Sequence, residues 1–338
     1  MSDAYRSVID ALSSCKRVLL TTHVRPDGDA LGTLAATIMG LKKKNIPADA
    51  LLLSHLPSKY AFVFTENEIK HFDTEQGWPA NLDLANYDAV LVMDTGTWSQ
   101  LPGLKEKLLS FHGKKIVVDH HLTQEDWADV KLVDTSAAAA GEIATELFER
   151  WQVPMDSSIA TALFLALVSD TGWFQFSNTK PHTLRMAADL IQAGVDTDRI
   201  YQLLYQNERP QRLAIQTRGL QSMQLFADGR LAVMTLSKND FEESQASVND
   251  TEALINIPLQ IATVQVSLLI TEPLQPGPIK MSLRSKGHLD CAAFAQSFGG
   301  GGHARAAGLK VDGTLANAHS EVTSALLSTP LFSDPAQR

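Results

Sequence analysis

The sequence predicts an α/β protein with an N-terminal doubly wound parallel sheet and a smaller C-terminal α/β domain, joined by a helical linker. In the first half of the 338 residues, short apolar runs alternate with segments whose apolar residues recur at helical spacing. The short runs are apolar on both faces, which is typical of parallel strands that helices cover on either side. Acidic residues and histidines directly follow three of these runs, so the same pattern also predicts where a site lies.

The N-terminal elements follow from these patterns. Residues 1–16 are amphipathic and predict a helix, and RVLLTT at residues 17–22 predicts the first strand. Apolar residues at helical spacing predict the next helix over residues 30–44. Further strands are expected at residues 48–53, 89–93 and 115–118. Further helices are expected at residues 137–151, 157–169, 182–193 and 197–223, with a break near Pro210 in the last of them.

The second half of the chain predicts a mixed domain. A β-rich region begins at Leu225, and the turn signal Asp228-Gly229 precedes its first long strand. Strands are expected at residues 230–236, 263–270 and 279–284, and a helix at residues 291–298. We therefore place a first domain at residues 1–194, a helical linker at residues 195–223 and a second domain at residues 224–338.

Composition restricts the classes of function. A formal net charge of −9 argues against a protein that grips long duplex nucleic acid, because that mode needs a basic surface. The negative charge is compatible with a small phosphorylated ligand, because metal ions and a few hydrogen-bond donors can hold such a ligand. The chain has no apolar run of about 18 residues and no signal peptide, so no membrane association is expected. Cys15 and Cys291 lie far apart without metal spacing, which predicts a cytoplasmic protein without disulfides.

Three of the expected strands end in side chains that bind metals. The first runs into THVRPDGDALG, the strand at residues 89–93 ends in VMDTG, and the strand at residues 115–118 ends in VVDHH. These segments supply His23, Asp27, Asp29, Asp94, Asp119, His120 and His121. Because the carboxyl ends of parallel strands meet at one edge of a sheet, where open α/β folds bind ligands, we expect the three groups to converge.

A fourth acid, Asp170, ends the apolar helical segment TALFLALVSD. Carboxylates mixed with imidazoles suit Mn²⁺ and related divalent ions, whereas structural zinc sites prefer thiolates. Each residue alone has a plainer explanation, since an Asp after a strand often caps a helix and His23 alone is more often a surface histidine. Independent capping would not also select two adjacent histidines, so the joint pattern favours a metal site.

Five segments carry a resemblance to a known family. HVRPDGDALG, VMDTG, VVDHH and SDTGWFQFSNT resemble the four motifs of the DHH phosphoesterase superfamily, in their usual order. GGGGHARAAG at residues 299–308 resembles the glycine-rich signature of the DHHA1 domain. The nearest resemblance is to the two-domain group of nanoRNase and pAp phosphatase (NrnA-like) enzymes. It implies an N-terminal DHH catalytic domain and a C-terminal DHHA1 substrate-binding domain.

The resemblance also implies a dinuclear site with two Mn²⁺ ions, or Mg²⁺ or Co²⁺ in their place. One ion would be held by His23, Asp27 and Asp94, and the other by Asp29, Asp94, His120 and Asp170. By the family pattern His121 would face the scissile phosphate as a catalytic residue, and Asp119 would orient its neighbours. Two divalent ions about 3.5–4 Å apart can activate a bridging water and clamp phosphoryl oxygens. A covalent route through Ser169 or Thr95 has no adjacent base.

The second domain supplies the expected substrate contacts. Gly301 and Gly302 let backbone N–H groups approach an anion, and His303 adds a donor. Arg284, in KMSLRSKG, resembles the family arginine that grips a terminal phosphate. Read without the resemblance, a flexible loop is the alternative for the glycines, and an arginine at a strand end is usually just solvated. Arg305 fills a position that varies in the family pattern.

These observations predict a manganese-dependent hydrolase of the oligoribonuclease and pAp phosphatase type. It would convert short RNA oligonucleotides to mononucleotides and pAp to AMP. The alternative is a phosphodiesterase of cyclic dinucleotides or of linear products such as pApA. An inorganic pyrophosphatase would lack the GGGH segment, a RecJ-type exonuclease would need a further nucleic-acid-binding domain, and a nucleotide sensor would have lost a metal ligand. The expected partners are short oligoribonucleotides, pAp and pApA, and a homodimer is a candidate assembly.

Overall fold

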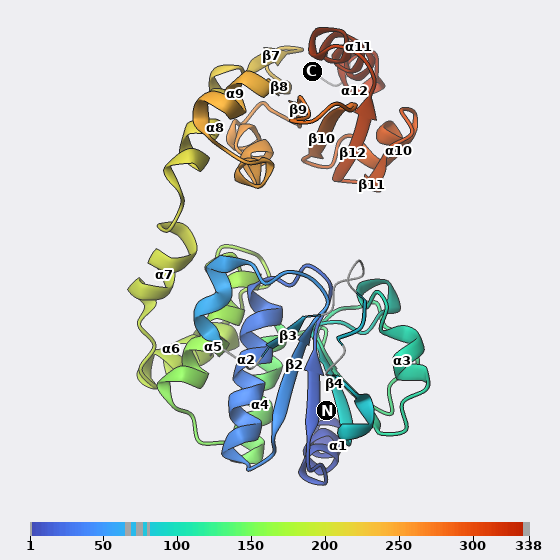
Figure 1. Cartoon of the computed structure of the whole chain (residues 1–338). Coiled ribbons are helices and arrows are strands. Elements are labelled where there is room, and N and C mark those ends of the chain that lie inside the picture. Colours follow the sequence, from blue (N-terminus) through green and yellow to red (C-terminus); the bar gives the residue numbers. More distant parts are fainter. Residues whose placement is uncertain (1, 65–68, 72–76, 80–81, 334–338) are drawn as a thin grey trace. The chain divides into compact units, whose positions relative to one another are not determined.

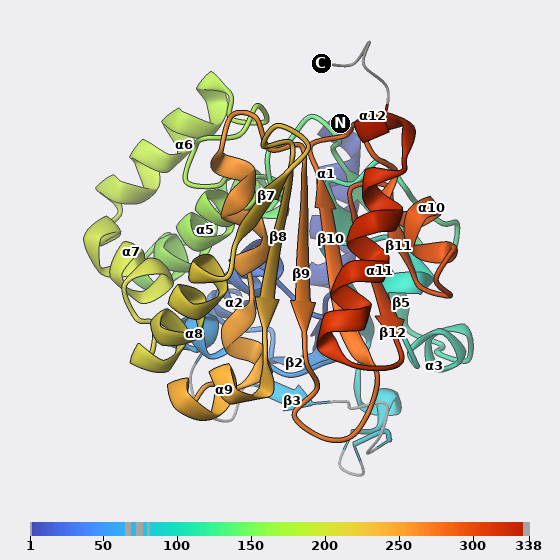
Figure 2. The same ribbon diagram turned by 90° about the horizontal axis from the view of Figure 1, so that it is seen from above.

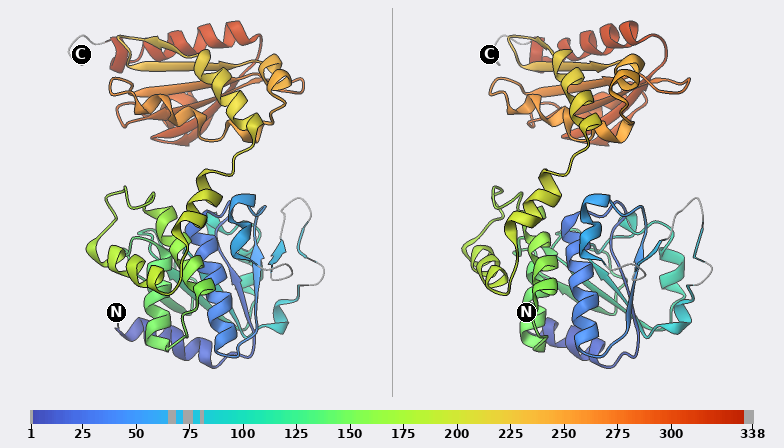
Figure 3. Two further views of the ribbon diagram at one scale, coloured as in Figure 1. Left: turned by 90° about the vertical axis from the view of Figure 1, so that its left-hand side faces the viewer. Right: turned by 60° about the vertical axis from the view of Figure 1, so that its left-hand side comes forward.

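The computed structural model describes residues 2–64, 69–71, 77–79 and 82–333. Figure 1 shows its elements, and Figures 2 and 3 show them from other sides. The chain divides into two compact units, Met1–Asn207 and Glu208–Arg338, and each has a sheet of its own. The α/β class and the presence of a second sheet confirm the predicted fold class. Among the described residues, no helix is both long and apolar enough to cross a membrane.

The sheet of the first unit has six strands within the described residues, all parallel, in the order β3-β2-β1-β4-β5-β6. The strands are β1 (Val18–Thr21), β2 (Ala48–Leu52), β3 (Ile69–His71), β4 (Ala89–Met93), β5 (Lys114–Asp119) and β6 (Val130–Val133). The strand order reverses between β1 and β4, as in a doubly wound fold. The carboxyl ends of β1, β4 and β5 are therefore neighbours at the switch point where such sheets bind ligands.

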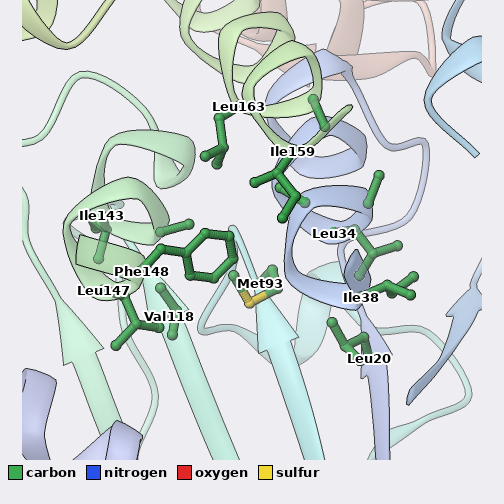
Figure 4. Close-up of a cluster of buried hydrophobic side chains, with 14 of the residues drawn as sticks. Leu20, Leu34, Ile38, Met93, Val118, Ile143, Leu147, Phe148, Ile159 and Leu163 are labelled. Atoms are coloured by element: carbon green, nitrogen blue, oxygen red, sulfur yellow. The ribbon is translucent and has the colours of Figure 1, made fainter. Parts of the chain in front are cut away.

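Helices cover both faces of this sheet. The longer ones are α1 (Ser2–Ser13), α2 (Gly28–Lys43), α4 (Ala140–Trp151), α5 (Ser157–Asp170), α6 (Pro181–Gln192) and α7 (Thr197–Tyr205). Figure 4 shows Phe148 of α4 and Leu163 of α5 packed with Met93 and Val118 of the sheet. On the other face, α3 (Lys105–Leu109) adds Leu108 to a second buried cluster. Single 3-10 turns lie at η1 (Ser58–Val63), η2 (Leu84–Asn86) and η3 (Trp98–Gln100).

Two glycines allow α2 to lie directly against α5. A Cβ atom on Gly32 would be 2.4 Å from the Ala162 carbonyl oxygen, and one on Gly28 would be 1.9 Å from Ser169 Oγ. Only a residue without a side chain fits such a close helix crossing. The contact places the N-terminus of α2 beside the C-terminus of α5, so acidic residues from both helices reach the same place.

The helix predicted over residues 197–223 consists of two helices in the structure. The helix α7 ends at Tyr205, and α8 (Pro210–Gln221) begins with Pro210 in its first turn. Proline has no N–H to donate and its ring would clash with the preceding turn, so it starts a new helix more readily than it continues one. The break between the two helices therefore consists of the four residues directly before Pro210, residues 206–209.

The second unit has a mixed six-stranded sheet within the described residues, in the order β11-β12-β10-β9-β8-β7. The strands are β7 (Gln224–Phe226), β8 (Leu231–Leu236), β9 (Val266–Thr271), β10 (Ile279–Ser285), β11 (Gly301–His303) and β12 (Ala306–Val311). Strands β8 and β9 are parallel, and the other neighbours are antiparallel. The glycine cluster, which could have been a flexible loop, instead contributes β11 at the edge of this sheet.

Helices also cover this second sheet. On one face lie α10 (Cys291–Gln296), α11 (Leu315–Leu327) and α12 (Pro330–Ser333), and Figure 2 shows α11 in front of the strands. Their apolar residues join those of β8, β9, β10 and β12 in one buried cluster. On the other face α8, α9 (Lys238–Ser244) and η5 (Leu254–Asn256) cover β8 and β9. Short turns η4 (Val248–Thr251) and η6 (Pro258–Gln260) flank η5.

Candidate metal centre

All eight residues that the sequence placed at the N-terminal site lie around the carboxyl ends of β1, β4 and β5. His23 follows β1, Asp94 follows β4, and Asp119 ends β5 with His120 and His121 directly behind it. The N-terminus of α2 adds Asp27 and Asp29, and Asp170 is the last residue of α5.

His23, Asp27 and Asp94 form the first group of possible metal ligands. His23 Nε2 lies 3.5 Å from Asp94 Oδ2 and 3.9 Å from Asp27 Oδ1. The other ring nitrogen, Nδ1, is 3.0 Å from the Val24 carbonyl oxygen, and this contact fixes the ring so that Nε2 faces the acids. Asp27 is also the N-cap of α2, where its Oδ1 accepts the N–H groups of Asp29 and Ala30.

Asp29, His120 and Asp170 form the second group. His120 Nε2 lies 3.3 Å from Asp94 Oδ1, 3.5 Å from Asp170 Oδ2 and 3.7 Å from Asp29 Oδ2. Asp94 thus turns one carboxylate oxygen toward each group. That is the arrangement a carboxylate needs to bridge two ions.

Asp94 is held in this position by an unusual backbone. Its φ is 61°, in the left-handed region that Asp and Asn tolerate better than most residues, and its N–H donates to the Val118 carbonyl of β5. The side chain is 3% exposed, and Oδ1 makes no hydrogen bond of good geometry within the described residues, although His120 Nε2 lies 3.3 Å away. Leaving a buried carboxylate oxygen unsatisfied is costly, so a bound cation fits this position.

The acids and imidazoles shift each other's protonation. Burial raises the pKa of Asp29 well above its usual range, and the charges of Asp94 and Asp170 add to the effect. Burial likewise raises the pKa of Asp170 to about 6. Burial opposes the charged form of His120 and His23, but the surrounding carboxylates, Asp94 foremost, together outweigh it and raise their pKa to about 10 and about 9. Without metal ions, protons occupy the site at neutral pH.

This charge state predicts that metal binding releases protons. A divalent ion needs neutral imidazoles and ionised carboxylates, so its affinity should rise as the pH increases from 6 toward 9, and binding at pH 7 should release at least one proton. Titration calorimetry in two buffers with different ionisation enthalpies measures both quantities. His182→Ala, at a half-exposed histidine beside Glu146, should behave as wild type. A pH-independent affinity without proton release would contradict the prediction.

Asp119 holds the two adjacent histidines in different orientations. It is fully buried, and its Oδ1 lies 2.8 Å from His121 Nδ1 and accepts the backbone N–H groups of His120 and His121. His121 therefore keeps Nε2 free, and its side chain is 55% exposed. It lines a cavity of about 590 Å³ together with His23, Asp94 and Asp170. The hydrogen bond with Asp119 raises the pKa of His121.

The structure adds two residues that the sequence did not single out. Gln124 donates from Nε2 to Asp119 Oδ2 and, at 3.1 Å, to the His121 carbonyl oxygen. Asn178 donates from Nδ2 to the carbonyl oxygens of Asp170 and Ala138, each at 3.0 Å. Asn178 stands in the quoted segment SDTGWFQFSNT, which was a signal for it, whereas nothing in the sequence distinguishes Gln124 from an ordinary loop residue.

Asp29 has a structural role besides its place in the second group. Its Oδ2 accepts the Ala140 N–H at 2.6 Å, and its Oδ1 accepts the Gly141 N–H at 2.9 Å. Its carboxylate therefore caps the N-terminus of α4, where the helix dipole favours negative charge. Thr33 Oγ1 donates a further hydrogen bond to Oδ1 at 3.0 Å.

The four expected substrate contacts all belong to the second unit. Arg284 is half-buried near the end of β10, and its Nη1 donates to the Leu283 carbonyl oxygen at 3.0 Å. Gly301, Gly302 and His303 form β11 and are exposed. Arg284 and His303 are both paired with Ala306 of β12, so the two cationic candidates lie on the same row of the sheet.

Comparison with known proteins gives matches over most of the chain. Residues 17–167 match the DHH family, N-terminal domain, and residues 228–328 match the DHHA1 domain. The bifunctional oligoribonuclease and PAP phosphatase NrnA of Thermus thermophilus is 27% identical over 300 residues, which are 88% of this chain and 84% of the relative. The protein of the same name from Bacillus subtilis is 24% identical over 90% of this chain and 92% of the relative.

One solved structure is similar along the whole chain. The exopolyphosphatase-related protein from Bacteroides fragilis has a TM-score of 0.84 and 23% sequence identity. The match covers 99% of this chain and 98% of that chain. At this identity the likeness concerns the fold.

Proposed function

The chain belongs to the DHH family, and we propose that it is a phosphoesterase that hydrolyses short RNA oligonucleotides to mononucleotides and pAp to AMP. The observation that carries the proposal is Asp94, a buried carboxylate that directs one oxygen toward each of two groups of possible metal ligands. The relatives from Thermus thermophilus and Bacillus subtilis are named for these two activities, which supports the choice of substrates.

We propose two Mn²⁺ ions as the cofactor, with Mg²⁺ or Co²⁺ as substitutes. His23, Asp27 and Asp94 would hold one, and Asp29, Asp94, His120 and Asp170 the other. The mixture of carboxylates and imidazoles supports this choice, because hard oxygen and borderline nitrogen ligands suit Mn²⁺. When bound, the ions would supply Lewis-acid stabilisation of the phosphoryl group and an activated water.

The protein side chains have separate tasks in this proposal. Asp119 holds Nδ1 of His121, which leaves Nε2 as the ring nitrogen for the phosphate, and His121 lines the cavity where the phosphate would lie. A raised pKa keeps this imidazole cationic over a wider pH range, and a cation there stabilises charge that develops on phosphoryl oxygens. Asp29 holds the N-terminus of α4 against the site and so limits how far the second group can shift.

We propose that the DHHA1 domain recognises the substrate. Arg284 and His303, with the backbone of Gly301 and Gly302, would hold the phosphate at the far end of the nucleotide. An arginine can form two parallel hydrogen bonds with a phosphate, which fixes its orientation. Residues 195–223, which contain α7 and α8, would serve as the linker between the catalytic and the substrate-binding domain.

The test is a panel of substrates incubated with the purified protein and Mn²⁺. We expect a five-nucleotide RNA to yield mononucleotides and pAp to yield AMP, with both activities lost in EDTA and restored by Mn²⁺. The panel also contains pApA, cyclic di-AMP and pyrophosphate. Faster turnover of cyclic di-AMP than of the RNA would replace the proposal with a cyclic dinucleotide phosphodiesterase. Pyrophosphate as the only substrate would overturn it.

A further inference from the structure

Part of the sheet in the second unit is open and basic. Residues paired across neighbouring strands share a face, so His303, Ala306 and Arg284 form one row on β11, β12 and β10. Lys310 and Lys280, which are paired directly and are both exposed, form another row on the same face of β12 and β10. This open face, from Arg284 and His303 to Lys280 and Lys310, therefore has cations at both ends.

The middle row of the open face is flat. It consists of Gly301, Gly308 and Ser282. A Cβ atom on Gly301 would meet nothing within 4 Å, and one on Gly308 would only approach the Met281 carbonyl oxygen to 3.5 Å. Neither glycine has a positive φ, so the backbone does not require a glycine at either position.

Two neighbouring glycines make the contrast clear. A Cβ atom on Gly300 would lie 2.3 Å from the Gly308 carbonyl oxygen, and one on Gly302 would lie 2.5 Å from the Ala306 carbonyl oxygen. Packing therefore demands glycine at those positions and not at Gly301 or Gly308. The missing side chains of Gly301 and Gly308 serve to keep the surface clear for something that lies on it.

The charges of the open face are not neutralised within the described part of the chain. Lys280, Lys310 and Arg284 take part in no ion pair there, whereas Arg209 and Arg218 of the same unit do. The rows of the open face contain no acidic residue on β10, β11 or β12. On a chain with a net charge of −9, such a cluster of free cations favours a polyanion.

The spacing indicates which polyanion fits. Four residues separate Arg284 from Lys280 on β10, which corresponds to about 13 Å along the strand. This is longer than the distance between neighbouring phosphates of a single strand, so the two ends of the face would contact phosphates that are not adjacent. Proteins that hold a single strand without reading its bases contact its backbone with positively charged groups, and the two cationic rows provide such groups.

We propose that the open face is a track for an RNA strand of at least three nucleotides, with one phosphate at Arg284 and His303 and a more distant one at Lys280 and Lys310. The inference rests on the proposed function and adds a length preference to it. A dinucleotide would reach only the end with Arg284. A longer oligonucleotide would also reach the lysine pair, which would hold it more tightly.

The test compares equilibrium binding of labelled RNAs of two and five nucleotides to the full chain in EDTA, by fluorescence anisotropy. In 0.1 M salt, Lys280→Gln with Lys310→Gln should weaken binding of the five-nucleotide RNA by about tenfold or more and lower its salt slope by about 0.7, which is the loss of one neutralised phosphate. Binding of the dinucleotide should not change. Lys238→Gln removes the same charge from an exposed position on α9 and should leave both affinities unchanged.

Gly308→Val tests whether the middle row of the open face must lack side chains, and it does not alter the charge. Valine suits a strand, and its Cβ atom would make only an ordinary van der Waals contact with the Met281 carbonyl oxygen, so the melting temperature should be kept while the five-nucleotide RNA binds more weakly. The proposed track would be refuted if wild type and the double lysine variant bound the five-nucleotide RNA with equal affinity. It would also be refuted if the double variant lost the same factor of affinity for both RNAs. A wild-type chain that binds the longer RNA through the lysines but hydrolyses nothing would instead refute the proposed function and leave the track intact.

Discussion

Asp94→Ala is expected to abolish hydrolysis of every nucleotide substrate and to remove the bound divalent ions. The Asp94 carboxylate lies between His23 Nε2 at 3.5 Å and His120 Nε2 at 3.3 Å, so both groups of ligands share it. Its loss should leave neither group able to hold an ion at its present geometry. Turnover measured with the five-nucleotide RNA, together with elemental analysis of the dialysed protein, checks both parts of this expectation.

The backbone at this position calls for a second variant. Alanine at a φ of 61° is strained, so Asp94→Ala could lose activity through folding alone. Asn tolerates the left-handed region and keeps the shape of the side chain, while it removes the negative charge that two cations would share. Asp94→Asn should therefore keep its circular dichroism spectrum and still lose metal and turnover. Two ions retained with near-normal turnover in Asp94→Asn would refute the assignment of the bridging ligand.

The convergence of the metal-binding residues could be predicted because the same segments of the sequence indicate both the strands and the possible ligands. The runs at β1, β4 and β5 are apolar on both faces, and each is followed at once by metal-binding side chains. Parallel pairing then places all three ends at one edge. The three groups meet only because these strands are neighbours, and the structure supplies that order as β1-β4-β5.

Some strands could not be predicted from the sequence. The strand β3 has only three residues, too few for a pattern to emerge, and a lysine interrupts the apolar residues of the four-residue strand β6 (VKLV). In β11 the sequence GGH has no preference for extended structure, and the strand exists because it pairs with β12. Such pairing depends on residues elsewhere in the fold, so local sequence cannot predict it.

The contacts of the supporting residues were also beyond the sequence, although Asn178 lies in a segment that resembles a family motif. Gln124 and Asn178 act through neutral amides that bond to Asp119 and to the backbone at Ala138. An amide has no pattern that marks it for such a role, and its partner can be 40 residues away, as Ala138 is for Asn178. The cap that Asp29 forms on α4 could not be predicted for the same reason, because Asp29 and Ala140 are 111 residues apart in the sequence.

His121→Ala should retain its divalent ions while turnover falls steeply. Removal of one group that stabilises charge on the transition state typically costs about 2–4 kcal/mol, so kcat should drop by roughly 30-fold to 900-fold. His120→Ala should instead weaken metal binding, because His120 directs Nε2 at three carboxylates. Elemental analysis and kcat measured on both variants separate the two roles, and each variant serves as the control for the other.

The distances alone would also allow a third group of metal ligands that includes His121, so the two histidine variants test which group binds an ion. Asp94, His120 and His121 offer atoms within 4.8 Å of one another, and His121 Nδ1 lies 3.7 Å from Asp94 Oδ1. That nitrogen, however, is already 2.8 Å from Asp119 Oδ1, and a buried carboxylate would lose its partner if Nδ1 turned to a metal ion. We therefore expect Nε2 of His121 to serve the phosphate and Nδ1 to stay with Asp119. Equal loss of metal from His121→Ala and His120→Ala would show that this hydrogen bond gives way to metal binding.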